Sequence, residues 1–247
     1  KEAATAARVA AEKGHKVTLF EKTYKLGGQV GIASVPPRKS EMKRSVSFFE
    51  AEMARLGVNV CMGTCPTADI LNTFDHVLIA VGSTNITIPV EGSDMPHVVS
   101  AWDVLAGKAI VYGKVSVIGG GLVGAETAEY LAQNGCQVSI VEMMPEIAKG
   151  ESSTVLPSMK ADFVAHGVKE LVNTKLMKID ATAVYGEDTT NGSSIVIPSD
   201  FVVMAVGARK NIFDCEGLTV PTTFIGDCKD RAADIYNAVR TAYDAAN

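Results

Sequence analysis

The feature that most constrains the fold of this 247-residue chain is an internal repeat. Residues 14–21 (GHKVTLFE) recur 121 positions later as residues 135–142 (GCQVSIVE). Both copies begin at a glycine, continue through an apolar stretch and end at an acidic residue. An alanine-rich stretch with helical spacing precedes each copy, at residues 3–13 and 125–134, and a glycine commonly ends a helix. Each copy therefore predicts a helix, a tight turn and a buried strand.

A second pair of apolar runs extends the repeat. Residues 77–82 (VLIAVG) recur as residues 202–207 (VVMAVG), and both have the length and β-branched content of strands buried on both faces. Helices that alternate with such strands indicate parallel sheets, so the expected fold class is α/β. The chain is long enough for two domains of about 100 to 150 residues each.

The second copy retains the segment that should precede its helix. Residues 114–118 predict a strand, and residues 119–124 (GGGLVG) fit the pattern G-x-G-x-x-G. A strand before the pattern, a helix after it and an acid 18 residues beyond its last glycine are the context of a dinucleotide-binding turn. Gly119 permits the turn, Gly121 lets the backbone approach a pyrophosphate, and Gly124 lets the helix pack closely.

The acid that ends this copy, Glu142, predicts which dinucleotide binds. In this position a carboxylate binds the ribose hydroxyls of the adenosine half and repels a 2′-phosphate. Met143 and Met144 carry no compensating cation, so the sequence favours NADH over NADPH. Leu122 and Val123 complete the predicted phosphate-binding turn. The alternative is a glycine-rich turn that holds no ligand.

The first copy has no such turn within the sequence. Shifting the repeat by 121 positions places the counterparts of Gly119 and Gly121 before Lys1 and puts Ala3 at the third glycine. We therefore expect a nucleotide fold that is truncated at its N-terminus. Excision from a longer protein and loss of the glycine pattern are both compatible with this expectation.

Composition argues against several other classes of protein. A net charge of −5 provides no attraction to nucleic acid or to an anionic membrane. No apolar run reaches the roughly 18 residues of a membrane span and no signal peptide is evident, so a cytoplasmic location is expected. The cysteines are odd in number and lack paired spacing, which predicts reduced thiols and no metal site. They are Cys61, Cys65, Cys136, Cys215 and Cys228.

Three short stretches around the first copy carry a family resemblance. Residues 17–22 (VTLFEK), 26–29 (LGGQ) and 35–39 (VPPRK) resemble the C-terminal half of 2,4-dienoyl-CoA reductase and 2-enoate reductase. Trimethylamine dehydrogenase is a more distant relative. The resemblance continues to residues 223–227 (TFIGD) and a closing helix at residues 231–246. In that family an N-terminal barrel carries FMN and an iron–sulfur cluster, and the C-terminal half, organised like glutathione reductase, binds FAD and the nicotinamide nucleotide.

The resemblance implies roles for individual residues. Glu21 matches the acid on the adenosine ribose of FAD, and Glu126 matches a helix acid that faces the nicotinamide. For Glu126 a solvated helix carboxylate is an equally good interpretation. The other matches belong to the loop beside the flavin, the turns after the paired strands, and the late motif at the flavin ribityl and phosphates. They are Gly27, Gly28, Gln29, Gly82, Gly207, Gly226 and Asp227; for the loop glycines and Asp227 an ordinary loop and a helix cap are the alternatives.

The predicted architecture is two Rossmann-like three-layer domains. Residues 1–113 and 209–247 form an FAD-type domain, and residues 114–208 are inserted into it as the NADH domain. The polar stretch at residues 186–194 predicts a hairpin or a surface loop. Because the first strand and its glycines are missing, we expect FAD binding to be weak or absent in this chain. The sequence also lacks a redox cysteine pair and a C-terminal His-Glu pair, which argues against a disulfide reductase.

Three functional hypotheses compete. In the first, NADH passes hydride to FAD, and the parent protein passes electrons on to an enoate or dienoyl thioester at its barrel, so the isolated chain is expected to be inactive. In the second, the chain is a non-catalytic module that holds ADP or nothing, as trimethylamine dehydrogenase permits; the complete glycine pattern and Glu142 favour the first. A stand-alone NADH-dependent reductase is disfavoured by the missing strand. The expected partners are nicotinamide and flavin nucleotides and the parent's barrel, with homo-oligomerisation and the organic substrate left open.

Overall fold

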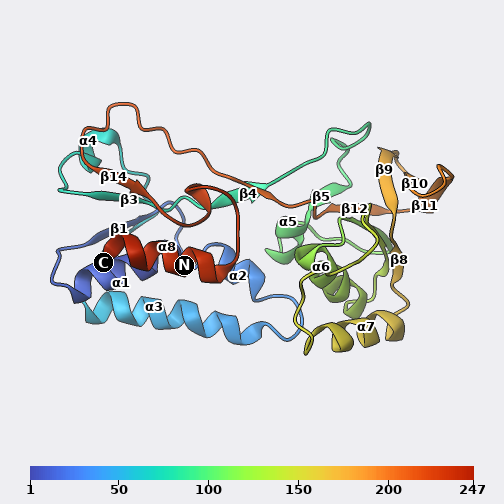
Figure 1. Ribbon diagram of the computed structural model, residues 1–247, viewed down its shortest axis with the longest axis horizontal. Helices are drawn as coiled ribbons and strands as arrows, with labels where there is room; N and C mark the ends of the chain where they lie inside the picture. Colours follow the sequence, from blue (N-terminus) through green and yellow to red (C-terminus); the bar gives the residue numbers. More distant parts are fainter. The chain divides into compact units, whose positions relative to one another are not determined.

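The computed structural model describes all residues, 1–247, and the chain divides into two compact units. Unit 1 comprises Lys1–Ser34, Glu41–Thr84 and Ala208–Asn247, and unit 2 comprises Val35–Ser40 and Asn85–Gly207. In the sequence, residues of unit 2 interrupt unit 1, as the colours of Figure 1 show.

Unit 2 is built on a five-stranded parallel sheet of order β5-β12-β6-β7-β8. Its central strand β6 pairs with β12 on one edge and with β7 on the other. Apolar side chains of β6 are buried on both faces of the sheet, as is typical of covered parallel strands. The strands are β5 (Val98–Ser100), β6 (Lys114–Ile118), β7 (Gln137–Val141), β8 (Lys169–Leu171) and β12 (Phe201–Met204).

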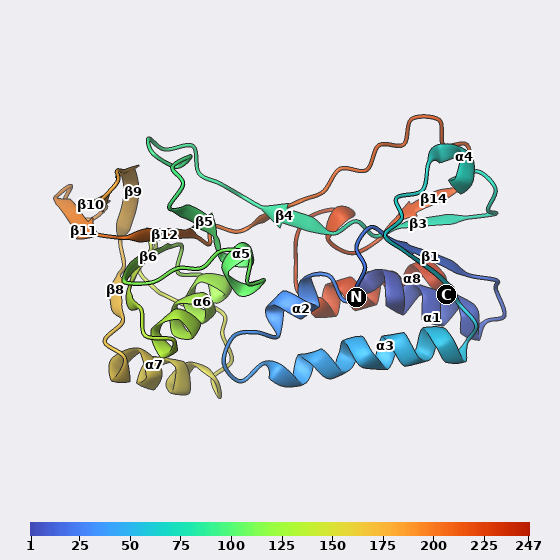
Figure 2. The ribbon, with the colours of Figure 1, turned by 180° about the vertical axis from the view of Figure 1, so that it is seen from behind.

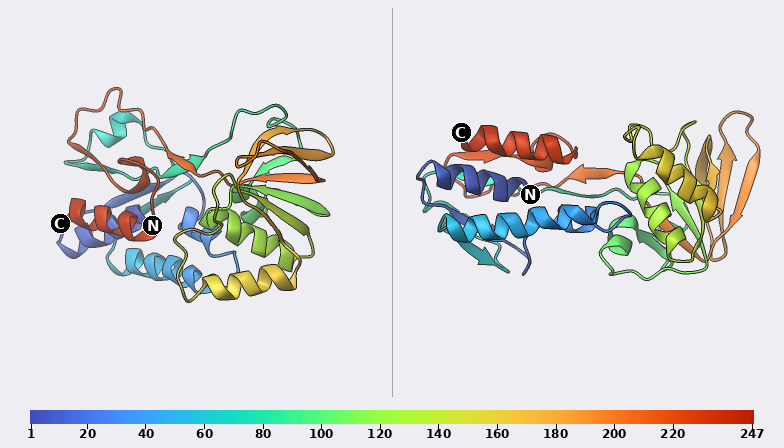
Figure 3. Two further views of the ribbon diagram at one scale, coloured as in Figure 1. Left: turned by 45° about the vertical axis from the view of Figure 1, so that its right-hand side comes forward. Right: turned by 90° about the horizontal axis from the view of Figure 1, so that it is seen from below.

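Two further layers cover this sheet, one on each face (Figure 3). Helices α5, α6 and α7 pack on one face, where small residues of α6 such as Ala125 and Ala128 allow a close approach. An antiparallel sheet of β9, β10 and β11 packs on the other face, and the predicted hairpin at residues 186–194 joins β10 to β11. These elements are α5 (Ala101–Leu105), α6 (Leu122–Gln133), α7 (Leu156–Ala165), β9 (Thr174–Ile179), β10 (Ala183–Asp188) and β11 (Ser194–Pro198).

Unit 1 contains two separate parallel pairs of strands (Figure 2). Strand β1 (Thr18–Glu21) pairs with β2 (Asn59–Met62), and β3 (Val77–Ile79) pairs with β14 (Thr222–Phe224). By the internal repeat, β1 corresponds to β7 and β3 corresponds to β12. In unit 2 these counterparts are joined by β6, whereas no strand of unit 1 pairs with both β1 and β3.

Helix α1 holds the two strand pairs of unit 1 together. It contacts both β1 and β3, and it lies between helices α3 and α8 (Figure 3). The helices of unit 1 are α1 (Glu2–Glu12), α2 (Gln29–Ala33), α3 (Lys43–Arg55), α4 (Ala68–Leu71) and α8 (Ile235–Ala246). Short 3-10 turns η1 (Ser40–Met42) and η2 (Gly226–Cys228) and a paired β4 (Ser83–Asn85) and β13 (Ala208–Lys210) complete the chain. None of these helices has the length and apolar character needed to cross a lipid bilayer.

The start of the closing helix and the ranges of the two units differ from those expected from sequence. Residues 35–40, expected in the first unit, group with unit 2. The closing helix begins at Ile235 rather than at residue 231, because the Asp234 carboxylate accepts a hydrogen bond from the Asn237 amide at 2.8 Å and caps the helix there. Residues 85–113 group with unit 2 rather than with unit 1, because β5 pairs with β12 and α5 packs against the same sheet. Which nucleotide each unit binds remains a prediction.

Candidate nucleotide-binding sites

The glycine turn after β6 has a backbone that tolerates no side chain at two of its positions. Gly119 has a φ of +98°, and a Cβ built there would lie 2.5 Å from the carbonyl oxygen of Ala205. A Cβ at Gly124 would overlap the carbonyl oxygen of Gly119. Glycine at both positions therefore lets the turn and the start of α6 pack directly against each other.

The other side of this turn is open. A Cβ at Gly121 would meet no atom within 4 Å, and the side chains of Leu122 and Val123 at the start of α6 are exposed. The first amides of a helix have no partner within the helix. The open side thus presents the hydrogen-bond donors and the positive end of the helix dipole that bind phosphate in such folds.

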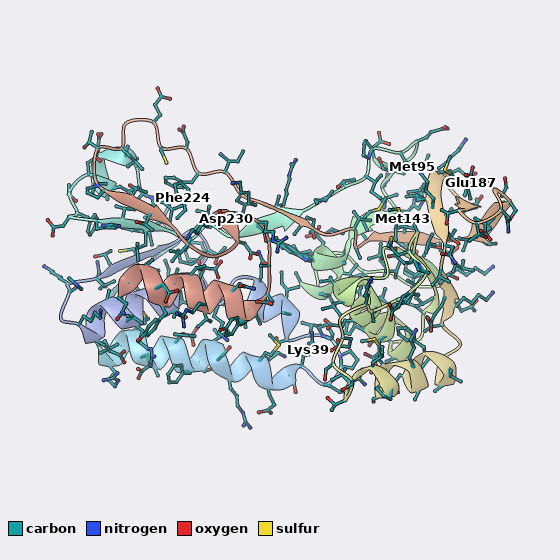
Figure 4. The ribbon with its side chains drawn as sticks, in the orientation of Figure 1. Lys39, Met95, Met143, Glu187, Phe224 and Asp230 are labelled. Carbon is teal, nitrogen blue, oxygen red and sulfur yellow. The ribbon has the colours of Figure 1, made fainter.

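Glu142 lies beside the glycine turn, immediately after β7. One carboxylate oxygen accepts a hydrogen bond from the Gly120 amide at 2.6 Å, and the other accepts from the Met144 amide at 2.7 Å. The side chains of Met143 (labelled in Figure 4) and Met144 are exposed and bring no positive charge. The glycine turn and Glu142, which the sequence predicts to bind the same dinucleotide, therefore lie next to each other.

Glu21, the counterpart of Glu142 in unit 1, has a related local geometry. One of its carboxylate oxygens accepts hydrogen bonds from the amide and the hydroxyl of Thr23, both at 2.8 Å. Like the Glu142 carboxylate, it accepts a hydrogen bond from the backbone amide two residues further along the chain. No glycine turn lies beside it, because unit 1 has no counterpart of β6.

A buried network joins three distant segments of unit 1. The Ser83 hydroxyl donates to the Asp227 carboxylate at 2.7 Å and lies 2.9 Å from the Gln29 amide nitrogen, which donates to it. The other Asp227 oxygen accepts from the Ala233 amide at 3.0 Å. Gln29 and Asp227, both predicted site residues, are therefore linked. Ser83 was missed, although it directly follows the predicted Gly82.

Two predicted glycines lie next to this network. A Cβ at Gly82 would be 3.4 Å from the side-chain nitrogen of Gln29, and one at Gly226 would be 2.6 Å from a carboxylate oxygen of Glu2. Both residues have a positive φ, +68° and +65°. The positive φ favours glycine at both positions, and a side chain at Gly226 would in addition displace the carboxylate of Glu2.

The remaining predicted glycines occupy turns. Gly27 has a φ of +114°, and a Cβ there would be 2.9 Å from Val46 of α3, whereas Gly28 faces open space just before α2. Gly207 in unit 2 has a φ of +103°, and its carbonyl accepts a hydrogen bond from the Ile86 amide at 3.0 Å. The structure therefore gives each a backbone reason to be glycine.

Glu126 is a buried helix acid, not a solvated one. Its residue is 7% exposed and its carboxylate forms an ion pair with Lys39. Burial raises the pKa of the Glu126 carboxyl above its ordinary value, and the hydrogen bond from Lys39 opposes that rise. Lys39 belongs to the VPPRK stretch that carried the family resemblance, but the sequence alone did not pair it with Glu126.

Residues 3–231 match the family described as pyridine nucleotide-disulphide oxidoreductase. The chain belongs to this family. It is 51% identical over 247 residues to bilirubin reductase of Mediterraneibacter gnavus, covering 98% of this chain and 38% of that protein. It is 35% identical over 257 residues to cinnamate reductase of Clostridium sporogenes, covering 98% of this chain and 37% of that protein.

Solved structures agree with this placement. A 2-naphthoyl-CoA reductase matches with a TM-score of 0.90 and 27% identity, covering 97% of this chain and 37% of that one. Thioredoxin reductase of T. acidophilum shares the fold, with a TM-score of 0.75 at 20% identity, over 99% of this chain and 93% of that one. The predicted resemblance to the nucleotide-binding half of large flavin-dependent reductases is confirmed. The chain spans less than two fifths of the length of the two curated relatives named above.

Proposed function

We propose that this chain is the nucleotide-binding part of an NADH-dependent flavin oxidoreductase. In the proposal, unit 2 binds NADH and unit 1 provides residues for FAD. The observation that carries it is the Glu142 carboxylate at the glycine turn, beside the open N-terminus of α6. Membership of a pyridine nucleotide-dependent family supports it.

The residues of unit 2 fit a dinucleotide. Gly121 leaves space for a pyrophosphate against the backbone, the first amides of α6 would bind its oxygens, and Glu142 would bind the ribose hydroxyls. When bound, NADH would supply a hydride and FAD would accept it, and the protein's part is to orient the two. Glu126, held by Lys39, is the ionisable residue of α6 proposed to face the nicotinamide.

The residues of unit 1 fit FAD in part. Glu21 would bind the adenosine ribose, and Gln29 and Asp227, held by Ser83, would contact the flavin side. The amides that should bind the pyrophosphate are not supplied, because unit 1 has no strand and glycine turn equivalent to β6 and Gly119–Gly124. We therefore propose that the chain retains FAD weakly or not at all.

The acceptor beyond FAD belongs to the proposal as well. One relative is named a cinnamate reductase, and cinnamate is itself a 2-enoate. We infer that the parent protein passes electrons to a conjugated organic acceptor at a flavin-bearing part outside these residues. The second candidate is a module that holds ADP without taking part in electron transfer.

The decisive experiment is titration of the protein with NADH and with NADPH. We expect tighter binding of NADH, and we expect Glu142→Ala to lose about tenfold in NADH affinity and most of its preference, because the ribose contacts and the repulsion of a 2′-phosphate both disappear. Glu187→Ala, at an exposed acid on β10 (Figure 4), is the matched control and should bind as wild type does.

Equal or tighter binding of NADPH by the wild type would refute the assignment. An undiminished preference in Glu142→Ala would do the same. Binding of ADP as tight as that of NADH, with no reduction of added flavin by NADH, would favour the non-catalytic module.

A further inference from the structure

The segment Val35–Ser40 is attached to α6 by two neighbouring cations. The Arg38 guanidinium donates to Glu129 of α6 and, at 2.8 Å, to Asp162 of α7. The next residue, Lys39 (labelled in Figure 4), forms an ion pair with Glu126 of α6. All of these residues belong to unit 2. The segment thus covers the face of α6 on which two carboxylates lie one turn apart.

Glu129 is an unusual residue for this position. It is 1% exposed, and one of its carboxylate oxygens has no hydrogen-bond partner. Burial raises the pKa of the Glu129 carboxyl, and Arg38 opposes the rise. A buried carboxylate is costly unless a cation compensates it, so Glu129 depends on the guanidinium that reaches it from the segment.

The backbone of Arg38 supports a special role for its side chain. Its φ is +66°, in the left-handed region that non-glycine residues seldom adopt. Two prolines, Pro36 and Pro37, stiffen the chain just before it. A strained backbone at a non-glycine residue is retained where the surrounding structure requires that side chain in that place.

Glu126 lies close enough to the predicted phosphate site for its charge to matter there. It is four residues beyond Leu122, the first residue of α6, which is about 6 Å along the helix axis. That distance is within the screening length of about 8 Å at physiological ionic strength. An uncompensated carboxylate at Glu126 would therefore repel a pyrophosphate at the start of α6.

We propose that Arg38 is a positioning residue for the dinucleotide-binding helix: by bridging Glu129 and Asp162 it fixes the Val35–Ser40 segment and holds Lys39 on Glu126. Lys39 then cancels the Glu126 charge beside the phosphate-binding end of α6. Arg38 touches no nucleotide in this scheme and acts through Lys39. The inference rests on the proposed binding of NADH to α6.

The test is the pH dependence of NADH affinity in Arg38→Met. With the segment released, Lys39 leaves Glu126, and Glu151 is the charged group that still acts on this carboxyl. Loss of the two cations raises the pKa of the Glu126 carboxyl further, so a falling pH removes its negative charge earlier than when Lys39 is in place. We expect NADH to bind roughly tenfold more weakly than to wild type at pH 8, and we expect the loss to be smaller at pH 6 because protonation reduces the repelling charge.

A second substitution isolates the cause. Adding Glu126→Gln to Arg38→Met removes the repelling charge. The double variant should therefore bind NADH as tightly at pH 8 as Glu126→Gln alone does, and it should show no difference between the two pH values. Lys160→Met, which removes a cation of α7 that pairs with Glu170 instead, is the matched control and should show wild-type affinity at both.

Two outcomes would overturn the proposal. One is a loss of affinity in Arg38→Met that is equal at both pH values, and the other is a loss that Glu126→Gln does not relieve; either makes Arg38 a purely structural residue. If Arg38→Met does not fold, Arg38→Met/Glu129→Met replaces the ion pair by apolar side chains and carries the same test. Failure of wild type to bind NADH at all would instead refute the proposed function.

Discussion

The two units of this chain contain the same sequence repeat but complete it differently. In unit 2, β6 pairs with β12 and β7 and leads into a glycine turn beside Glu142. In unit 1, the counterparts β3 and β1 have one paired edge each, and Glu21 has no turn beside it. The same local pattern thus forms a continuous sheet with a glycine turn in unit 2, and two separate strand pairs without such a turn in unit 1. A central parallel strand both closes the sheet and presents the phosphate-binding amides.

The largest effect should come from supplying unit 1 with the missing element. We expect the chain itself to carry little or no FAD, and we expect an N-terminal extension that encodes a β-branched strand and the first two glycines of the G-x-G-x-x-G pattern, with Ala3 at its third position, to give stoichiometric FAD. The reason is that the extension would fill the unpaired edges of β1 and β3 and present amides to the pyrophosphate. Visible absorbance of the purified protein measures the flavin.

The matched control for this experiment is the same extension with valine in place of one glycine. Here the valine stands at the second glycine of the extension, because the third position of the pattern is Ala3 of the chain itself. This variant should pair with the strands but keep the backbone away from the phosphates. Stoichiometric FAD in the chain without any extension would contradict the comparison. Loss of self-association on extension would support the closure of the open sheet edges.

A smaller effect is expected when the completed fold of unit 2 is damaged. Gly124→Val should destabilise folding by about 3 kcal/mol and weaken NADH binding, because its side chain would overlap the Gly119 carbonyl. Gly121→Ala faces open space, so it should leave stability unchanged while narrowing the approach of the pyrophosphate. Denaturant unfolding and NADH titration separate the two effects, and wild-type behaviour of Gly124→Val in both would argue against the fold assignment.

The smallest effect compares a buried serine in each unit. Ser83→Ala removes the hydroxyl that donates to the buried Asp227 carboxylate and should cost about 2 kcal/mol of unfolding free energy. Ser116→Ala in unit 2 removes a bond to the neutral hydroxyl of Ser199, so a loss of about 1 kcal/mol is expected. Equal losses of unfolding free energy in the two variants would mean that the hydrogen bond from Ser83 to the Asp227 carboxylate is no stronger than one between two neutral hydroxyls.

The local elements of both units were predictable because their causes are local. The strand at residues 114–118 follows from an apolar run of suitable length, and α6 follows from alanine spacing after a glycine turn. The glycine at residue 124 was expected at a close contact, and the structure has the Gly119 carbonyl there. The start of α8 was predicted too early, because the Asp234 cap sets where the helix begins and helical spacing alone does not show it.

The candidate site was predictable only where one short segment contains it. Gly119, Gly121 and Gly124 lie within six residues, and Glu142 follows at the spacing that a helix and a strand require. Ser83 was not predicted, because its partner Asp227 lies far along the chain. No sequence pattern in either segment indicates that the two residues meet. Arg38 and Lys39 lie in a stretch that resembles the family, but the sequence does not indicate which acidic residues they pair with.

The sequence by itself determined the alternation of helices and strands, the turn that specifies a dinucleotide fold, and the acid expected to select NADH. These follow from side-chain periodicity and from the steric freedom of glycine, which act between near neighbours. Only the tertiary structure decided that residues 85–113 join unit 2, that β1 and β3 lack a common neighbour, and that Arg38 compensates Glu129. Strand pairing and the pairing of buried charges depend on which distant segments meet, and that is settled by packing the whole chain.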